Sequence, residues 1–251
     1  MAHVFAIVNQ KGGIGKTTFS MQIGVGLRRR GFKVLMIDMD AQCNLTFTLR
    51  GDYKNSPTIL EAIFEEVNVE DTIQHLDEVD LIPGSANLTT LEQQIDPEGR
   101  EYFLSETIKP LLSKYEYIII DSPPTISLIT VGIMTAANSI IVPVLLDMYS
   151  LQGTGQLYKT YATVKQYCNP SLQIDGIVVN GPGRTLKRTL KEVAEVMNCR
   201  IFRTSISRSP QIKHATIKRE SIYRYAPKSS VRKEFDQLID ELLSIRRGEV
   251  D

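Results

Sequence analysis

Short apolar runs alternate along the whole chain with longer segments in which apolar residues recur every three or four positions. Runs of the first kind are typical of buried strands, and the second pattern is typical of helices. The predicted strands are 3–8, 33–38, 79–82, 116–121, 138–145 and 173–180. The predicted helices are 17–30, 58–66, 86–94, 99–114, 126–137, 150–167, 185–198 and 229–246.

This alternation predicts an α/β fold, in which a mostly parallel, twisted sheet is flanked by helices on both faces. No repeat, low-complexity tract or long linker interrupts the pattern, so we expect residues 1–251 to form a single domain. Such sheets place ligand-binding loops at the carboxyl ends of their strands. The polar segments that follow the predicted strands are therefore the first candidates for a functional site.

Residues 9–18, which read Asn-Gln-Lys-Gly-Gly-Ile-Gly-Lys-Thr-Thr, join the first predicted strand to the first predicted helix. Glycine tolerates positive φ and lets backbone N–H groups converge on an anion, and the positive end of the helix dipole points at the same place. The segment therefore predicts the phosphate-binding loop of a P-loop NTPase. Lys16 would contact the β- and γ-phosphates, and the Thr17 hydroxyl would bind Mg²⁺.

The loop departs from the usual spacing, because Gln10 stands where the first glycine is expected and a second lysine, Lys11, follows it. In this it resembles the deviant Walker A motif of the ParA/MinD family. The resemblance implies that Lys11 crosses a dimer interface to the partner's nucleotide, and that Lys11 and Lys16 both serve catalysis. It further implies that ATP is bound by Lys11, Gly12, Gly13, Ile14, Gly15, Lys16, Thr17 and Thr18.

Two carboxylates, Asp38 and Asp40, follow the second predicted strand. Alternate residues of an extended chain point the same way, so both side chains face the same region. A carboxylate there can orient a water molecule or serve Mg²⁺ through water. The segment resembles the family pattern Asp-x-Asp-Pro-Gln-x-Asn, with Ala41 in place of the proline and Cys43 in place of a common glycine. The resemblance implies that Asp40 positions the attacking water, and we assign Asp38 to the metal.

The run Tyr117-Ile118-Ile119-Ile120-Asp121 has the form of a Walker B strand, which delivers one carboxylate to the outer shell of the metal. Asp121 is thus the second carboxylate predicted at the metal, beside Asp38 and the Thr17 hydroxyl, and no glutamate follows it that could act as a base. Asn180 ends the last predicted strand. The resemblance implies that it hydrogen-bonds adenine, and the competing interpretation is an asparagine that only forms a turn.

Lys and Arg number 29, as do Asp and Glu, so the net charge is zero, but the charges are unevenly distributed. Residues 184–233 hold 14 Lys and Arg against three Asp and Glu. This basic region predicts a surface that binds a polyanion, against the alternative of an ordinary solvated charge run. The candidate DNA-binding residues are Arg184, Arg208, Lys213, Lys218 and Arg219, of which Arg184 matches a family segment on the DNA-binding side.

The terminal helix 229–246 has apolar residues at helical spacing, which favours packing on the core over a membrane anchor of the MinD type. No apolar run approaches the roughly 18 residues of a membrane span. The three cysteines lie far apart in the sequence, which disfavours a zinc or iron–sulfur site and is typical of a reducing compartment.

The resemblance extends from Val4 to about Leu243 and implies a ParA-type partition ATPase. With ATP and Mg²⁺ bound, it would form a homodimer that binds DNA without sequence preference and is released on hydrolysis stimulated by a ParB-like partner. We expect a cytoplasmic, nucleoid-associated protein without stable membrane association. The alternatives are a MinD-like membrane-associated positioning ATPase, an iron–sulfur reductase and a metabolic P-loop kinase.

Overall fold

Seven strands form one sheet in the computed structural model, which describes residues 1–181 and 187–249. Their order is β3-β4-β2-β5-β1-β6-β7, with β3 antiparallel to β4 and every other pair parallel. The strands are β1 (His3–Ile7), β2 (Val34–Asp38), β3 (Gln74–His75), β4 (Asp80–Ile82), β5 (Tyr117–Asp121), β6 (Ser139–Val144) and β7 (Gln173–Val179). All six predicted strands are confirmed, and β3 is an additional edge strand too short to show a pattern.

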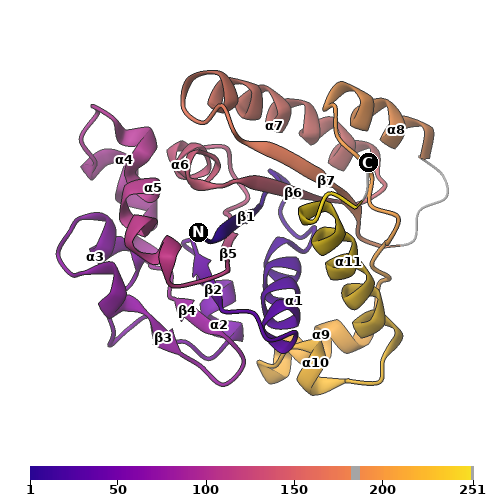
Figure 1. Cartoon of the computed structure of the whole chain (residues 1–251), viewed down its shortest axis with the longest axis horizontal. Coiled ribbons are helices and arrows are strands. Elements are labelled where there is room, and N and C mark those ends of the chain that lie inside the picture. Colours follow the sequence, from indigo (N-terminus) through magenta and orange to yellow (C-terminus); the bar gives the residue numbers. More distant parts are fainter. Residues whose placement is uncertain (182–186, 250–251) are drawn as a thin grey trace.

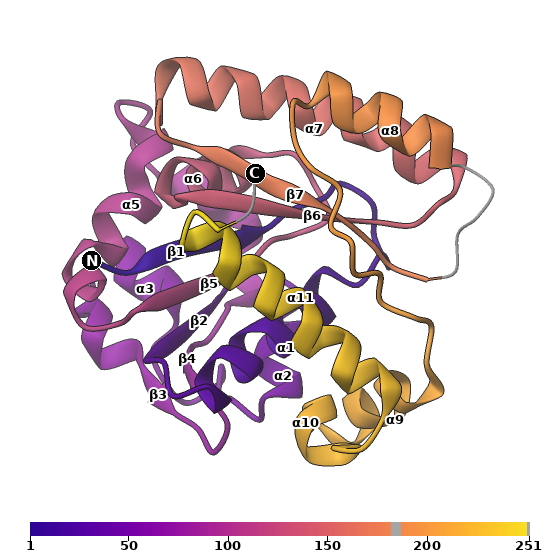
Figure 2. The ribbon, with the colours of Figure 1, turned by 45° about the vertical axis from the view of Figure 1, so that its right-hand side comes forward.

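Helices cover both faces of the sheet, as predicted (Figures 1 and 2). Along β1, Val4 and Ala6 belong to one buried cluster and Phe5 and Ile7 to the other, because successive side chains of a strand point to opposite faces. The first cluster is covered by α3 (Ile59–Ile63), α4 (Leu91–Gln94), α5 (Phe103–Ile108), α6 (Leu128–Ala136), α7 (Met148–Tyr167) and α8 (Lys187–Val196). The second is covered by α1 (Lys16–Arg29), α2 (Asn44–Thr48), α9 (Pro210–Lys218), α10 (Ile222–Tyr225) and α11 (Ser230–Arg246).

One predicted helix is wrong. Segment 99–114 is not continuous but consists of a 3₁₀ turn at Arg100–Tyr102, the α-helix α5 and a second 3₁₀ turn at Lys109–Ser113. Pro110 explains the second break, because it lacks the N–H that a continuing helix needs. Segment 86–94 likewise begins as a 3₁₀ turn, Ala86–Thr90, before α4. The short helices α2, α9 and α10 had no predicted counterpart.

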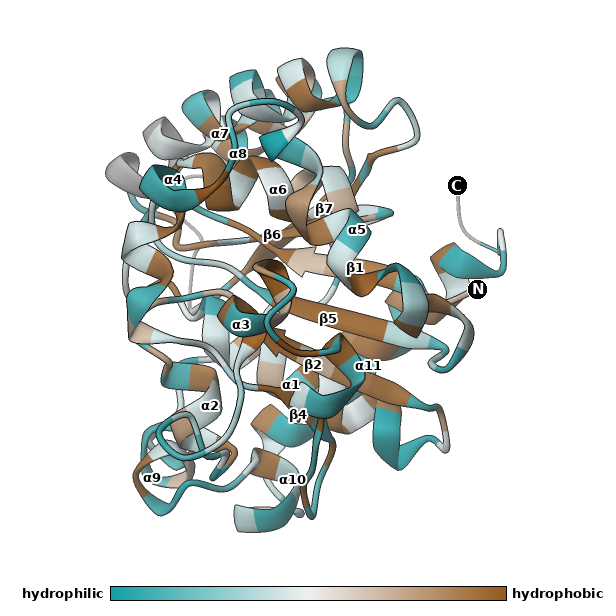
Figure 3. Ribbon diagram, turned by 90° about the vertical axis from the view of Figure 1, so that its left-hand side faces the viewer, coloured by the Kyte–Doolittle hydropathy of each residue, from teal (hydrophilic) through white to brown (hydrophobic). Residues whose placement is uncertain are grey.

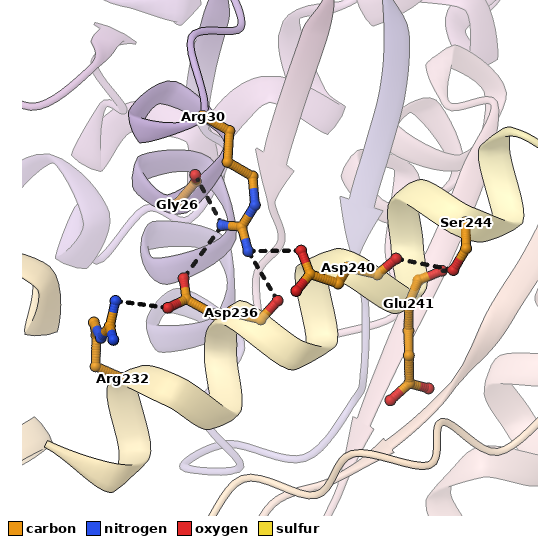
Figure 4. A network of polar contacts seen from close by, with 7 residues as sticks. All are labelled: Gly26, Arg30, Arg232, Asp236, Asp240, Glu241 and Ser244. Atoms are coloured by element: carbon orange, nitrogen blue, oxygen red, sulfur yellow. Dashed lines mark hydrogen bonds and ion pairs between the residues drawn. The ribbon is translucent and has the colours of Figure 1, made fainter.

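The terminal helix packs on the core, as predicted. Its apolar residues Val231, Phe235, Leu238, Ile239 and Leu242 are all buried. Figure 4 shows how the helix is also held by charge: Arg30, the residue directly after α1, donates to Asp236 at 3.2 Å and to Asp240 at 2.8 Å. The face that a membrane anchor would need is therefore buried against α1 and the sheet. Within the described residues, no helix is both long and apolar enough to cross a bilayer.

Candidate functional site

The loop between β1 and α1 has the backbone of a phosphate-binding loop. Gly13 and Gly15 adopt φ values of +74° and +97°, in the left-handed region that favours glycine. Asn9 fixes the start of the loop, since its Oδ1 accepts from the Lys11 N–H at 3.0 Å and its Nδ2 donates to the Pro143 carbonyl at 2.8 Å. The loop is thus anchored to β6 before it turns into α1, whose N-terminus favours an anion.

The two lysines of the loop occupy different environments. Lys16 is only 7% exposed, its Nζ donates to the Lys11 carbonyl at 3.3 Å, and burial lowers the pKa of its ammonium group while Asp121 and Asp40 oppose that shift. The Lys11 ammonium group instead contacts both carboxylate oxygens of Asp147 at 2.8 Å, with 32% of the Lys11 side chain exposed. Lys16 thus lies inside the site and Lys11 lies at its rim.

Asp38 and Asp121 lie side by side in register at the carboxyl ends of β2 and β5, and both are fully buried. Burial raises the pKa of both carboxyl groups, and the charge of Asp38 raises that of Asp121 further. The oxygens of Asp38 are used within its own loop: Oδ2 accepts from the Thr46 N–H at 2.8 Å and from the Thr46 hydroxyl at 2.7 Å, and Oδ1 accepts from the Asp40 N–H at 3.2 Å.

Asp121 is different, because only one of its oxygens is well partnered. Its Oδ1 accepts from the Ser20 hydroxyl at 2.7 Å, whereas its buried Oδ2 has no hydrogen-bond partner at normal geometry among the described residues. A buried carboxylate oxygen of this kind, with the Thr17 hydroxyl nearby, is the donor set that Mg²⁺ prefers. The residues present therefore fit the predicted metal, with Asp121 better placed to hold it than Asp38.

Cavities lie on both sides of the phosphate loop. One, of about 510 Å³, is lined by Lys16, Thr17 and Asp40, the last of which is 7% exposed. The other, of about 460 Å³, is lined by Gly13, Gly15 and Asn180. The Nδ2 of Asn180 donates to the Ile14 carbonyl at 2.6 Å, so this side chain also supports the phosphate loop itself.

Comparison with known proteins identifies the fold family. The family model described as "AAA domain" matches residues 2–174. The sporulation initiation inhibitor protein Soj of Bacillus subtilis is 32% identical over 238 residues, which cover 91% of this chain and 93% of Soj. The chromosome partitioning protein ParA of Caulobacter vibrioides is 30% identical over 253 residues, which cover 97% of this chain and 95% of that protein. This chain belongs to the ParA/MinD family.

Solved structures of the ParA/MinD fold agree with this assignment. A cobyrinic acid a,c-diamide synthase of Mycobacterium smegmatis, with bound ADP and magnesium, has a TM-score of 0.86 at 29% identity and covers 100% of this chain and 97% of its own. The septum site-determining protein MinD of Pyrococcus horikoshii, complexed with Mg-ADP, has a TM-score of 0.81 at 26% identity, with both chains fully covered. The predicted family and fold are confirmed.

The two departures from the ParA/MinD pattern lie in the loop after Asp40. Cys43, at the position where the family commonly has glycine, is buried and has φ +51°, which L-residues rarely adopt. Glycine is common at this position of the family because it adopts positive φ without strain. In this chain a cysteine has the same conformation. Burial raises the pKa of the Cys43 thiol to about 12, so the side chain is a neutral packing group.

The predicted DNA-binding residues of this family member do not share one environment. Arg208 and Lys213 line the cavity beside Asn180, and Lys218 is exposed on α9. The guanidinium group of Arg219 lies 4.5 Å from the centre of the Phe47 ring and donates to the Phe47 carbonyl at 2.7 Å. Arg184 lies outside the described residues.

Sequence reasoning missed four side chains that shape the site: Ser20, Thr46, Asp147 and Phe47. Ser20 had a usable signal, because it lies one helical turn after Lys16 and therefore on the same face. Thr46 lies only eight residues after Asp38, but the sequence does not show that the chain folds back to bring the two together. Asp147 and Phe47 act through contacts between segments far apart in the sequence, for which a single sequence offers no signal.

Proposed function

We propose that this chain is a ParA-type partition ATPase, which hydrolyses ATP with Mg²⁺ between two copies of itself. The observation that supports this most is the separation of its two loop lysines. Lys16 is buried where it would neutralise the phosphates of its own nucleotide, and Lys11 lies at the rim, where it could reach the nucleotide of a second copy. The two lysines of this loop would thus contact two different nucleotides, one in each copy.

Each of the other site residues has a role in this proposal. The Thr17 hydroxyl and the Oδ2 of Asp121 would hold Mg²⁺, which supplies charge neutralisation at the phosphates. Asp40, beside Lys16 in the same cavity, would orient the attacking water. On the other side of the loop, the Oδ1 of Asn180 would accept a hydrogen bond from an adenine amino group.

The contact between Lys11 and Asp147 is no obstacle to dimerisation. Their side chains are 32% and 40% exposed, and an exposed ion pair of this kind contributes about 0–1 kcal/mol. Binding of the ammonium group to a phosphate on the second copy would replace so weak a pair, because the attraction between charges is stronger where less water screens it, as it would be between two joined copies.

The basic region supports nonspecific DNA binding by the dimer. Several of its side chains are exposed, and Lys and Arg neutralise phosphates without reading sequence. These exposed residues are Arg203, Arg208, Lys213, Lys218, Arg224, Lys228 and Lys233. Hydrolysis stimulated by a ParB-like protein would release the DNA, and we expect a cytoplasmic, nucleoid-associated partition ATPase. The buried apolar face of α11 gives no support to the MinD-like alternative.

The test is an ATPase assay with Lys16→Ala, Lys11→Ala and Asp40→Ala, with and without DNA. Asp40→Ala is expected to dimerise with ATP and to retain DNA, while its hydrolysis falls at least a hundredfold, because only the water-orienting group is lost. Loss of ATP-dependent dimerisation in Asp40→Ala would contradict its role. Wild-type protein that ignores DNA with ATP but sediments with anionic liposomes would favour the MinD-like alternative instead.

A further inference from the structure

A cluster of contacts joins the loop that carries Asp40 to the basic helix α9. These contacts belong to none of the sequence motifs, and the proposed function gives them no role. Helix α2 begins four residues after Asp40, and α9 belongs to the basic region more than 150 residues later in the chain. The two helices nevertheless lie in contact, and Figure 3 shows them beside each other.

Two arginines make this junction. Arg219, just after α9, stacks on the Phe47 ring of α2 at 4.5 Å and donates through Nε to the Phe47 carbonyl at 2.7 Å. Arg50, just after α2, donates in return to the carbonyls of Arg219 and Lys218, both at 3.2 Å. Each arginine thus contacts the C-terminal part of the helix that the other arginine follows. We call these four contacts the Arg50–Arg219 junction.

The backbone just after α2 and just after α9 adopts a conformation that residues other than glycine rarely adopt. Arg50 and Arg219 have φ values of +66° and +55°, which for residues other than glycine cost on the order of 1–3 kcal/mol each. The chain after each helix thus contains an arginine in this unfavourable conformation, and the side chain of that same arginine contacts the neighbouring helix. Surrounding structure has to hold such a conformation in place, and the reciprocal contacts do so.

The junction is connected to the catalytic carboxylates through Thr46. This residue of α2 donates twice to Asp38, and its hydroxyl also accepts from the Gly84 N–H at 3.0 Å. Asp38 in turn accepts from the Asp40 backbone, so α2 and the Asp40 loop form one hydrogen-bonded unit. On the other side, Thr216 of α9 lines the same cavity as Asp40 and Phe47.

We infer that Arg50 and Arg219 are positioning residues, which fix the Asp40 loop to α9 so that the water-orienting carboxylate and the basic surface keep a defined relative placement. Arg219 acts by this contact and not by binding DNA. This inference rests on the proposed function, because it assigns to the junction the link between hydrolysis and the DNA-binding region.

The test uses Arg219→Lys, Arg50→Lys and Phe47→Leu, with Arg247→Lys as the matched control. The lysine variants keep the charge but lose the stacked, forked guanidinium group. Phe47→Leu keeps the carbonyl acceptor and removes the ring without touching any charge. Arg247 is exposed, and within residues 1–181 and 187–249 its ion pair is a local one, through Nε to Glu249 at 2.7 Å, so its variant should behave as the wild type does.

The first measurement is hydrogen exchange over residues 43–50 in the nucleotide-free protein. Exchange is expected to become at least threefold faster in Arg219→Lys, Arg50→Lys and Phe47→Leu, and the double variant Arg50→Lys/Arg219→Lys should be less than additive, because both changes break the same junction. The second measurement is kinetic: kcat should fall about threefold to tenfold with KM for ATP within twofold, the size expected for loss of one such contact.

Two results would overturn the inference. One is wild-type exchange and wild-type kcat in Arg219→Lys and Phe47→Leu combined with weaker DNA retention, which would make Arg219 a phosphate contact. The other is a raised KM at unchanged kcat in Phe47→Leu, which would make Phe47 a nucleotide contact. If the wild type neither hydrolysed ATP nor retained DNA, the proposed function would fail, whereas the exchange measurement would still decide whether the junction holds the loop.

Discussion

Gly15 shows how a single position can be restricted in two independent ways. Its φ of +97° is unfavourable for any other residue, and a Cβ atom there would lie 2.7 Å from the Nδ2 of Asn180. Because Asn180 donates to the Ile14 carbonyl at 2.6 Å, it cannot move aside without breaking this hydrogen bond to the loop.

We therefore expect Gly15→Ala to weaken ATP binding at least tenfold and to lower the free energy of unfolding by about 1–3 kcal/mol. Titration calorimetry and denaturant unfolding measure the two effects. Gly155→Ala is the control, because an added Cβ meets nothing within 4 Å in the middle of α7 and alanine favours the helix. Wild-type nucleotide affinity in Gly15→Ala would show that the loop tolerates a side chain here.

At this scale, the residues that sequence reasoning identified are those with local determinants. The glycines and Lys16 could be predicted because strand, turn and helix follow one another within some fifteen residues. Whether Asp38 or Asp121 keeps a free oxygen could not be predicted, since Thr46 and Ser20 decide it from other elements. The same holds for Arg219, whose charge indicated DNA whereas its position beside Phe47 is a matter of tertiary structure.

Among the elements, α1 and α11 pack unusually closely. A Cβ on Gly26 would lie 2.3 Å from Cδ1 of Ile239 and 2.5 Å from the Tyr223 hydroxyl, both of which belong to buried residues. In an exposed helix, a change from glycine to alanine stabilises by about 1 kcal/mol. At Gly26 the added methyl group would instead collide with buried neighbours, so the same change should destabilise the protein.

We predict that Gly26→Ala lowers the free energy of unfolding by about 1–3 kcal/mol, as overpacking of a core does. Chemical denaturation measures this, and Gly155→Ala again provides the comparison in which the same change is harmless. A Gly26→Ala protein as stable as the wild type would mean that α11 can shift away from α1 at little cost.

At the C-terminal end of α11, a contact between Arg246 and His3 makes the free energy of unfolding depend on pH. His3 of β1 contacts the Ser139 hydroxyl at 2.9 Å and the guanidinium group of Arg246 at 3.1 Å. Burial, together with the charge of Arg246, lowers the pKa of His3 from 6.5 to about 3. The unfolded chain then binds this proton first, so the stabilisation is complete above pH 6.5 and is lost progressively below it.

Between pH 7.5 and pH 5 this residue should therefore reduce the free energy of unfolding by about 2 kcal/mol. His3→Gln should remove that part of the pH dependence, as measured by urea unfolding at the two pH values. His214→Gln, which replaces an exposed histidine of α9, is the control for the loss of a histidine. An unchanged dependence in His3→Gln would mean that folding does not lower the pKa of His3.

Elements were predictable where the apolar pattern was long and uninterrupted, as in α1, α7 and α11. Helix α9 was not predicted because polar and charged residues dominate it and leave few apolar positions to set a period, and α10 was not predicted because its four residues are too few to show one. The predicted helix 99–114 had a convincing pattern, but Pro110 interrupts the hydrogen bonds that would have made it continuous.

At the scale of the whole molecule, the candidate nucleotide site and the basic region are built on the same sheet. The phosphate loop, the Asp40 loop and Asp121 all lie at the carboxyl ends of neighbouring parallel strands, as such a sheet requires. The later part of the basic region, with α9 and α10, packs on the same face of the sheet as α1, the helix that begins at the phosphate loop, whereas α8 packs on the other face. A change at the nucleotide can thus reach the basic surface through directly packed elements.

The central claim is that ATP joins two copies of the chain and that Lys11 completes the partner's site. It is tested most directly by sedimentation of the wild type and of Lys11→Ala with Mg²⁺ and a nonhydrolysable ATP analogue, well above its dissociation constant. The account predicts a dimer for the wild type and a monomer for Lys11→Ala, with analogue affinity in Lys11→Ala within about tenfold of the wild type because Lys16 still binds the phosphates in each copy. A wild type that stays monomeric when saturated, or a Lys11→Ala protein that dimerises as well as the wild type, would contradict it.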